Sequence, residues 1–238
     1  MAPKILAIVP ARGGSKGIKG KNLKKLQGVS LVARCGQVLK DIEQISLALV
    51  STDSEEIAEE ARRNGLQVPF LRPDSLSGDL ISDIDVLQHA LVEAEHFAKT
   101  TFEIILMIQP TSPMRQKSDV TDVLYRMQQG AFDSVFTVSE TDSKGHPFKQ
   151  FTLDGDTISY FDKRGESIIA RQQLKPTYHK NGLVYAVTRE CLVSQATLLG
   201  KSASYVCTRR LTVNIDTPLD LQFADFLLSG QHEFGSSV

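Results

Sequence analysis

Short apolar segments alternate with helical patterns along the first part of the chain. The apolar segments lie at residues 5–9, 46–54, 103–113 and 133–139, and they are rich in Ile, Leu and Val. Strands that are apolar along most of their length are typically buried on both faces, as in a parallel sheet between two layers of helices. The sequence therefore predicts an α/β fold with a mostly parallel, doubly wound sheet.

Helix signals fill the gaps between these strands. Ser54 is expected to cap one helix, because its side chain can accept a hydrogen bond from the first turn. Residues 82–98 carry apolar side chains at helical spacing, and a further helix is expected at 118–129. The segment "TPLD" at 217–220 has the pattern of a capping box with proline at the first helical position.

The alternation is interrupted after residue 139. Residues 151–161 have the pattern of a β-hairpin, with Asp154-Gly155 at the turn. A charged stretch follows, and an apolar strand resumes at 181–188. We interpret residues 140–180 as an excursion from the core rather than as a separate domain.

The remaining segments complete one domain. Residues 211–216 are expected to form the last strand of the sheet. A chain of 238 residues suits one large α/β domain with a sizeable core, and we assign this domain to residues 1–230. The tail at 231–238 is expected to be mobile, as unpacked termini usually are.

Composition narrows the classes of partner. The chain has 27 basic and 28 acidic residues, whereas nucleic-acid-binding proteins are usually more basic, so no nucleic-acid partner is expected. Its three cysteines are far apart and form no CxxC pair, which favours a reducing cytoplasm. The apolar run at 5–10 is shorter than a signal segment or a membrane span. We therefore expect a soluble, cytoplasmic protein without a membrane partner.

The loop "VPARGGSKGIKGKN" at 9–22 is the strongest functional signal. It contains four glycines and four cationic residues and follows the first strand. Glycines expose backbone N–H groups that can converge on phosphate oxygens, and Arg12, Lys16 and Lys21 add cationic donors. In an open α/β sheet, ligands bind at the carboxyl ends of the strands. The loop is therefore predicted to bind an anionic ligand.

Other motifs fit this loop less well. A P-loop would need glycine in place of Ser15 and Ser or Thr in place of Asn22, and the dinucleotide fingerprint GxGxxG is absent. The run "GGSKG" matches the nucleophile elbow GxSxG, but an elbow needs a sharp turn directly into a helix. The chain instead continues through five residues before any helix can begin. A solvated loop without a ligand remains the structural alternative.

Six segments in sequence order resemble the cytidylyltransferases that activate nonulosonic acids, namely the CMP-sialic acid synthetases and their legionaminic- and pseudaminic-acid relatives. They are the opening loop "IVPARGGSKGIKGKNL", "VSTDSEEIAEEA", "FLRPDSLSGD", "IQPTSPMR", "ARQQLKPTYHKNGLVYAV" and "NIDTPLDLQFAD". Together they span most of residues 4–227. The resemblance implies a Rossmann-like nucleotidyltransferase fold. It also implies transfer of CMP from CTP to the C2 hydroxyl of an α-keto acid sugar, with magnesium as cofactor and pyrophosphate as second product.

The resemblance also implies roles for single residues on the nucleotide side. Arg12, Lys21 and Asp216 would be catalytic, with Arg12 and Lys21 on the triphosphate and Asp216 on the metal. The nucleotide would also contact Gly13, Gly14, Ser15, Asn22, Arg72 and Ser82. Two positions depart from the family: Asp83 replaces a serine that members often carry, and Asn214 replaces an acid found in some relatives.

On the sugar side, the resemblance implies that the acceptor contacts Gln109, Lys149, Arg171, Tyr178 and Asn181. Lys149 and Arg171 lie in the excursion, and cationic groups there would suit the carboxylate of the acceptor. Family members are typically homodimers in which this excursion reaches into the neighbouring subunit's site. We therefore expect a homodimer with shared active sites.

Two other functions stay open. One is activation of the eight-carbon acid Kdo by a related cytidylyltransferase with a similar opening loop. The other is a non-catalytic nucleotide-sugar binder, which would be expected to lose Asp216 or the loop cations. The sequence does not choose among sialic, legionaminic and pseudaminic acids, which differ in deoxygenation, stereochemistry and N-acyl groups.

Overall fold

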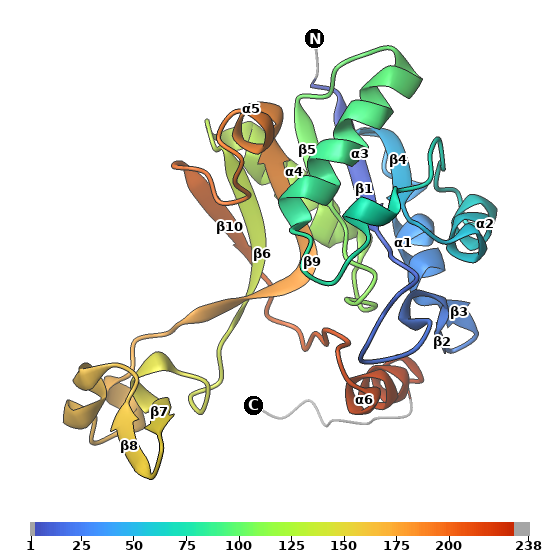
Figure 1. Cartoon of the computed structure of the whole chain (residues 1–238). Helices are drawn as coiled ribbons and strands as arrows, with labels where there is room; N and C mark the ends of the chain where they lie inside the picture. The colour runs from blue at the N-terminus through green and yellow to red at the C-terminus, as the bar shows by residue number, and fades with distance from the viewer. Residues whose placement is uncertain (1–2, 231–238) are drawn as a thin grey trace.

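The computed structural model describes residues 3–230, and Figure 1 shows a central sheet between two layers of helices. The sheet has the strand order β10-β6-β9-β5-β1-β4. Its strands are β1 (Ile5–Pro10), β4 (Ile45–Ser51), β5 (Ile104–Met107), β6 (Ser134–Glu140), β9 (Tyr178–Thr188) and β10 (Ala203–Cys207). Strand β1 pairs in parallel with β4 and β5, and β6 pairs in parallel with β10. Only β9 is antiparallel to its neighbours β5 and β6, so the predicted mostly parallel sheet is confirmed.

The helices cover both faces of this sheet. Helices α1 (Leu31–Leu39), α2 (Glu55–Arg63) and α4 (Lys117–Gln129) pack on one face, and α3 (Asp83–Ala98) and α5 (Arg189–Val193) pack on the other. Strand β1 contributes side chains to the cores on both faces of the sheet. Its Ile5 and Ala7 join the first core cluster and its Leu6 and Ile8 the second, because successive strand side chains point to opposite faces.

A third, smaller core cluster connects the opening loop with the C-terminal part of the chain. It contains Ile18 of the loop, Leu26 of the short strand β2 (Lys25–Leu26) and Leu227 of helix α6 (Pro218–Leu228). Strand β2 forms a two-stranded ribbon with β3 (Val29–Ser30). The loop after β1 therefore packs against α6, which is distant from it in sequence.

The prediction of a last strand at 211–216 is wrong. The structure has no strand there, and the last strand of the sheet is β10, an edge strand that the sequence pattern did not reveal. Val213 and Ile215 bury their side chains in the third core cluster with α6 instead of pairing in the sheet. Strand β10 gave a weak signal because it is short and its side chains alternate between exposed and half-buried.

The excursion projects from the sheet on the ends of β6 and β9 (Figure 1). It carries the predicted hairpin, formed by β7 (Phe151–Asp154) and β8 (Thr157–Tyr160), and three short 3₁₀ helices. Gly155 has a φ of 54° in the hairpin turn, a left-handed conformation that glycine adopts without strain.

The predicted helix starts are confirmed. The side chains of Ser54, Ser82 and Thr217 each cap a helix, and Thr217 forms the full capping box with Asp220. Across residues 3–230, no helix combines the length and hydropathy needed to cross a membrane. The tail at 231–238 lies outside the described residues.

Candidate active site

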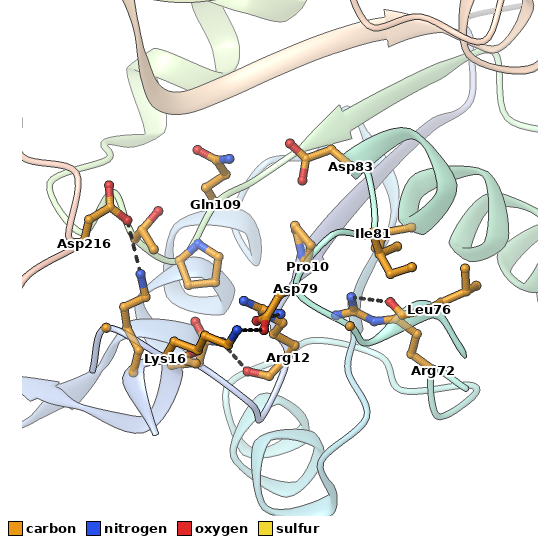
Figure 2. Close-up of a pocket in the computed structure, with 18 residues that line it drawn as sticks. Pro10, Arg12, Lys16, Arg72, Leu76, Asp79, Ile81, Asp83, Gln109 and Asp216 are labelled. Atoms are coloured by element: carbon orange, nitrogen blue, oxygen red, sulfur yellow. Dashed lines mark hydrogen bonds and ion pairs between the residues drawn. The ribbon is translucent and has the colours of Figure 1, made fainter. Parts of the chain in front are cut away.

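A cavity of about 400 Å³ lies at the carboxyl ends of β1 and β5. Its walls come from four parts of the chain: the loop after β1, the segment 72–83, the turn after β5, and Asp216 before α6. Figure 2 shows these segments converging on one space. The position is the one expected for a ligand site in an open α/β sheet.

The loop after β1 is held by contacts with its own chain. The Asn22 side-chain amide donates a hydrogen bond to the backbone oxygen of Arg12 over 2.9 Å. The Gly13 amide donates to Asp53 Oδ1 over 2.7 Å. At Gly17, an added Cβ would lie 2.7 Å from the backbone oxygen of Asp216, a separation that only glycine tolerates. The loop therefore has a fixed path beside Asp216.

Two cations of the loop share one carboxylate. Arg12 Nη1 lies 2.7 Å from Asp79 Oδ1, and the ammonium of Lys16 pairs with the other oxygen of Asp79 (Figure 2). The hydrogen bond from Lys16, followed by that from Arg12, lowers the pKa of the Asp79 carboxyl. This arrangement shows that Arg12 and Lys16 can converge on a single anionic group. A phosphate that binds both cations must compete with Asp79.

Lys21 and Asp216 form a second charged pair at the other end of the cavity. Lys21 Nζ lies 3.3 Å from Asp216 Oδ1 and donates to the backbone oxygen of Ile215 over 2.9 Å. The Lys21 side chain is 16% exposed, whereas that of Asp216 is 71% exposed. Asp216 therefore presents an accessible carboxylate next to a fixed ammonium.

The accessible Asp216 carboxylate has the chemistry of a magnesium ligand. Within residues 3–230, no group of three or more His, Cys, Asp or Glu side chains could hold a metal by itself. Magnesium is commonly bound by one or two carboxylates together with substrate phosphates and water. Asp216 could supply such a ligand beside the loop cations.

Arg72 forms a buried wall of the same cavity. It is only 6% exposed, and its Nη2 donates to the backbone oxygen of Ser51 over 2.6 Å. Burial lowers the pKa of its guanidinium, while the nearby negative charge of Asp53 opposes this shift. Its Nε has no hydrogen-bond partner in the described part of the chain. Because a buried unpaired N–H is costly, Arg72 is suited to donate to a bound ligand.

Gln109 occupies the wall formed by the turn after β5. The buried guanidinium of Arg115 donates to the backbone oxygens of Gln109 and Gly182, which joins this turn to β9. Gly182 has a φ of 77°, and an added Cβ there would lie 2.8 Å from Gln109 Oε1 and 2.3 Å from Ser112 Oγ. The position of the Gln109 side chain therefore depends on glycine at 182.

The structure brings together seven of the sequence-predicted site residues. The cavity is lined by Arg12, Ser15, Lys21, Asn22, Arg72, Gln109 and Asp216. Gly13 and Gly14 belong to the same loop but do not line the cavity, and the Gly13 amide is already bonded to Asp53. Ser82 caps α3 and lines a neighbouring cavity instead.

The other predicted sugar ligands lie apart from this cavity. Lys149 and Arg171 sit in the excursion, where Arg171 lines a separate cavity. Tyr178 is half exposed at the start of β9. Asn181 is buried, and its side chain bonds to Ser139 Oγ and to the backbone amide of Leu183. In a single chain these four residues therefore do not join the nucleotide-side residues.

Sequence reasoning did not single out Asp79, although it ends the quoted segment "FLRPDSLSGD". Its contacts with Arg12 and Lys16 depend on the path of two loops, which no local spacing reveals. Asp83 was noted only as a departure from the family, yet it lines the cavity together with Thr111.

The chain resembles known proteins along nearly its whole length. It is 26% identical over 227 residues to a CMP-N,N'-diacetyllegionaminic acid synthase of Campylobacter jejuni, covering 95% of both chains. It is 28% identical to a pseudaminic acid cytidylyltransferase of the same species, covering 97% of this chain and 98% of the relative.

The fold resembles the solved structure of a CMP:2-keto-3-deoxy-manno-octonic acid synthetase complexed with CTP. The TM-score is 0.69 at 18% identity, covering 96% of this chain and all of the other. The sequence profile of the cytidylyltransferase family matches residues 6–220. The chain therefore belongs to the cytidylyltransferase family and is a nucleotidyltransferase of the acylneuraminate cytidylyltransferase type.

Proposed function

We propose that the protein transfers CMP from CTP to the C2 hydroxyl of a nonulosonic acid and releases pyrophosphate. The observation that carries this proposal is the meeting of Arg12, Lys16, Lys21 and Asp216 in one cavity at the carboxyl end of β1. The relatives named for legionaminic and pseudaminic acid support the class of acceptor.

The reaction exchanges one phosphoanhydride for a phosphodiester. The acceptor hydroxyl oxygen forms a bond to the α-phosphorus, the bond from that phosphorus to the bridging β-oxygen breaks, and the hydroxyl proton passes to solvent. Such a transfer needs charge neutralisation and in-line positioning more than covalent catalysis. Arg12 and Lys16 would exchange Asp79 for phosphate oxygens, and Lys21 would bind the triphosphate from the opposite end of the cavity.

Asp216 would hold a magnesium ion in this arrangement. The bound ion would neutralise negative charge on the phosphate oxygens as the α-phosphate is attacked. Lys21 pairs with Asp216, so this carboxylate would already be held in position when the nucleotide binds. Arg72 and the side chain of Asn22, which is already bonded to the loop, would orient the nucleoside.

We also propose a homodimer with shared sites. The excursion leaves large apolar side chains open to solvent, including Leu153, Ile158 and Phe161, which are 76%, 63% and 67% exposed. Packing against a second copy would bury them. The same packing could bring Lys149 and Arg171 to the partner's cavity, where they would bind the acceptor carboxylate.

We further propose a cytoplasmic location. The free cysteines Cys35, Cys191 and Cys207 fit a reducing cytoplasm.

The test is a coupled assay of pyrophosphate release with CTP, magnesium and a panel of acceptors. The panel contains N-acetylneuraminic, legionaminic, pseudaminic and eight-carbon Kdo acids, and the CMP-sugar is identified by mass spectrometry. Turnover with a nine-carbon acid, and none without acceptor, is the expected result. Preference for Kdo would favour the second candidate function, since the chain shares its fold with a CMP:2-keto-3-deoxy-manno-octonic acid synthetase. CTP binding without turnover on any acceptor would indicate a non-catalytic binder.

A further inference from the structure

The turn at the end of β4 holds two separate walls of the nucleotide cavity. On one side, the amide of Ala11 in the loop after β1 donates to the backbone oxygen of Ser51 over 3.0 Å. On the other side, the amide of Arg72 donates to the backbone oxygen of Thr52 over 2.7 Å, and its guanidinium donates to that of Ser51. Ser51 and Thr52 are both fully buried. The loop and the segment that begins at Arg72 are therefore anchored on the same turn.

Asp53 follows this turn, is half-buried, and contacts the loop directly. Its Oδ1 accepts the hydrogen bond from the Gly13 amide over 2.7 Å. A Cβ added at Gly13 would lie 3.2 Å from Ser54 Cβ and 3.7 Å from Asp53 Oδ1, so the loop lies close against the end of β4. Asp53 itself does not line the cavity. Any effect of Asp53 on a ligand must therefore pass through its neighbours.

The charge of Asp53 also acts on Arg72. Burial lowers the pKa of the Arg72 guanidinium, and the negative charge of Asp53 is the largest influence that opposes this shift. The positive charge of Arg12 lowers the pKa further, whereas Asp83, which lines both this cavity and the neighbouring one, opposes the shift less strongly. Two arginines thus line one cavity (Figure 2). A buried cation beside another cation needs a compensating negative charge, and Asp53 supplies most of it.

We propose that Asp53 is a positioning residue that joins the two ends of the nucleotide site. Its carboxylate holds the loop through the hydrogen bond from Gly13 and holds the buried Arg72 through its charge, so that both walls are in place before a nucleotide binds. This role rests on the proposed function, because it presumes that the loop binds the triphosphate and Arg72 the nucleoside of one CTP molecule.

The two contributions of Asp53 can be separated chemically. An asparagine at this position keeps an oxygen that accepts the hydrogen bond from Gly13 but carries no charge. An alanine has neither. Inorganic tripolyphosphate has no nucleoside, so its affinity reports on the loop alone, whereas the affinity of CTP reports on the loop and Arg72 together.

The first test is Asp53→Asn, with calorimetric titration of CTP and of tripolyphosphate at the same magnesium concentration. CTP should bind about tenfold more weakly, because Arg72 loses its compensating charge, and tripolyphosphate should bind within about twofold of wild type. Removing a negative charge near an anion site would by itself strengthen the binding of both ligands. Unchanged or tighter binding of CTP therefore overturns the proposal.

The second test is Asp53→Ala, which also removes the acceptor for Gly13. Tripolyphosphate should now bind about tenfold more weakly than it binds Asp53→Asn, since the loop is no longer held. The matched control is Glu56→Gln, which removes an exposed charge from the first turn of α2 outside the cavity. It should change neither affinity. Equal tripolyphosphate binding by the alanine and asparagine variants would show that the Gly13 bond does not position the loop.

The third test is a double-mutant cycle, which does not depend on the alanine variant being folded. In an Arg72→Met background, Asp53→Asn should weaken CTP binding by less than about twofold, because the residue through which its charge acts is gone. In a Lys21→Ala background, the full tenfold loss should remain. A tenfold loss in both backgrounds would show that Asp53 does not act through Arg72.

The outcomes separate the two proposals. A wild-type protein that does not bind CTP, or that transfers CMP to no nonulosonic acid, refutes the proposed function. A wild-type protein that does both, combined with wild-type CTP affinity in Asp53→Asn, refutes only the positioning role of Asp53.

Discussion

The loop after β1 and the excursion between β6 and β9 both carry cations expected to bind the substrates, but only the loop cations have partners in their own chain. Arg12 is paired with Asp79, and Lys21 with Asp216. Within residues 3–230, the side chains of Lys149 and Arg171 make no hydrogen bond or ion pair. The loop is thus arranged in advance, whereas Lys149 and Arg171 have no anionic partner within the described residues, although Arg164 of the same excursion pairs with Asp162.

This difference suggests two ways of building a binding site. Contacts within the chain hold the nucleotide side, which limits the entropy lost when a triphosphate binds. The excursion extends away from the sheet (Figure 1), so Lys149 and Arg171 would reach a substrate anion by docking on another molecule. Each of the following predictions tests one side of this contrast.

The largest effect is expected at the nucleotide side. Asp216→Ala should lower kcat by about 100-fold or more, because a metal ion supplies several kcal/mol of charge stabilisation in the transition state. Binding of CTP should weaken much less, since Arg12, Lys16 and Lys21 remain. Steady-state kinetics at saturating magnesium and calorimetry with CTP measure the two effects.

The control for this substitution is Asp122→Ala, which removes an exposed aspartate of α4 outside the cavity. It should leave kcat unchanged. A folded Asp216→Ala protein with near-wild-type turnover would show that Asp216 does not hold the metal.

The second prediction addresses the excursion. Arg171→Ala and Asp216→Ala proteins, each inactive alone, should recover up to roughly a quarter of wild-type activity when mixed under conditions of subunit exchange. In the mixed dimer, one composite site contains both intact residues and the other contains neither. Activity is followed by pyrophosphate release after exchange of differently tagged subunits.

Exchange itself is verified by co-purification of the two tags. If mixed dimers form and activity does not return, Arg171 acts in the site of its own chain. The contrast between the two regions would then be lost, because the excursion would have to fold back onto its own cavity.

How far the sequence predicts this molecule depends on how local the signal is. The caps at Ser54 and Thr217 and the turn at Gly155 follow from residues a few positions apart, and the structure confirms them. The edge strand was misplaced because the apolar residues Val213 and Ile215 pack against α6. Burial against a distant helix cannot be told from burial in a sheet by the pattern alone.

The same limit applies to the site. The loop cations were found because glycines and lysines are concentrated in one short segment. The role of Asp79 and the meeting of two cavities at Asp83 were not predicted. Both depend on how the segment 72–83 folds over the end of β1. The charges that face the loop cations therefore depend on segments that are distant in sequence, which local motifs do not reveal.

The smallest expected effect concerns the paired cations themselves. Asp79→Asn removes the carboxylate that competes with phosphate for Arg12 and Lys16, so CTP should bind about two- to fivefold more tightly, since exposed ion pairs are weak. Asp74→Asn, an exposed change in the same segment outside the cavity, is the control.

Because Lys16 and Arg12 lower the pKa of the Asp79 carboxyl, its competition with phosphate operates fully at neutral pH. It should disappear only as the pH falls through that lowered pKa. Calorimetric titration with CTP measures the effect at two salt concentrations, and the gain should shrink at the higher one. Weaker binding in Asp79→Asn would mean that Asp79 helps to position the cations instead of competing for them.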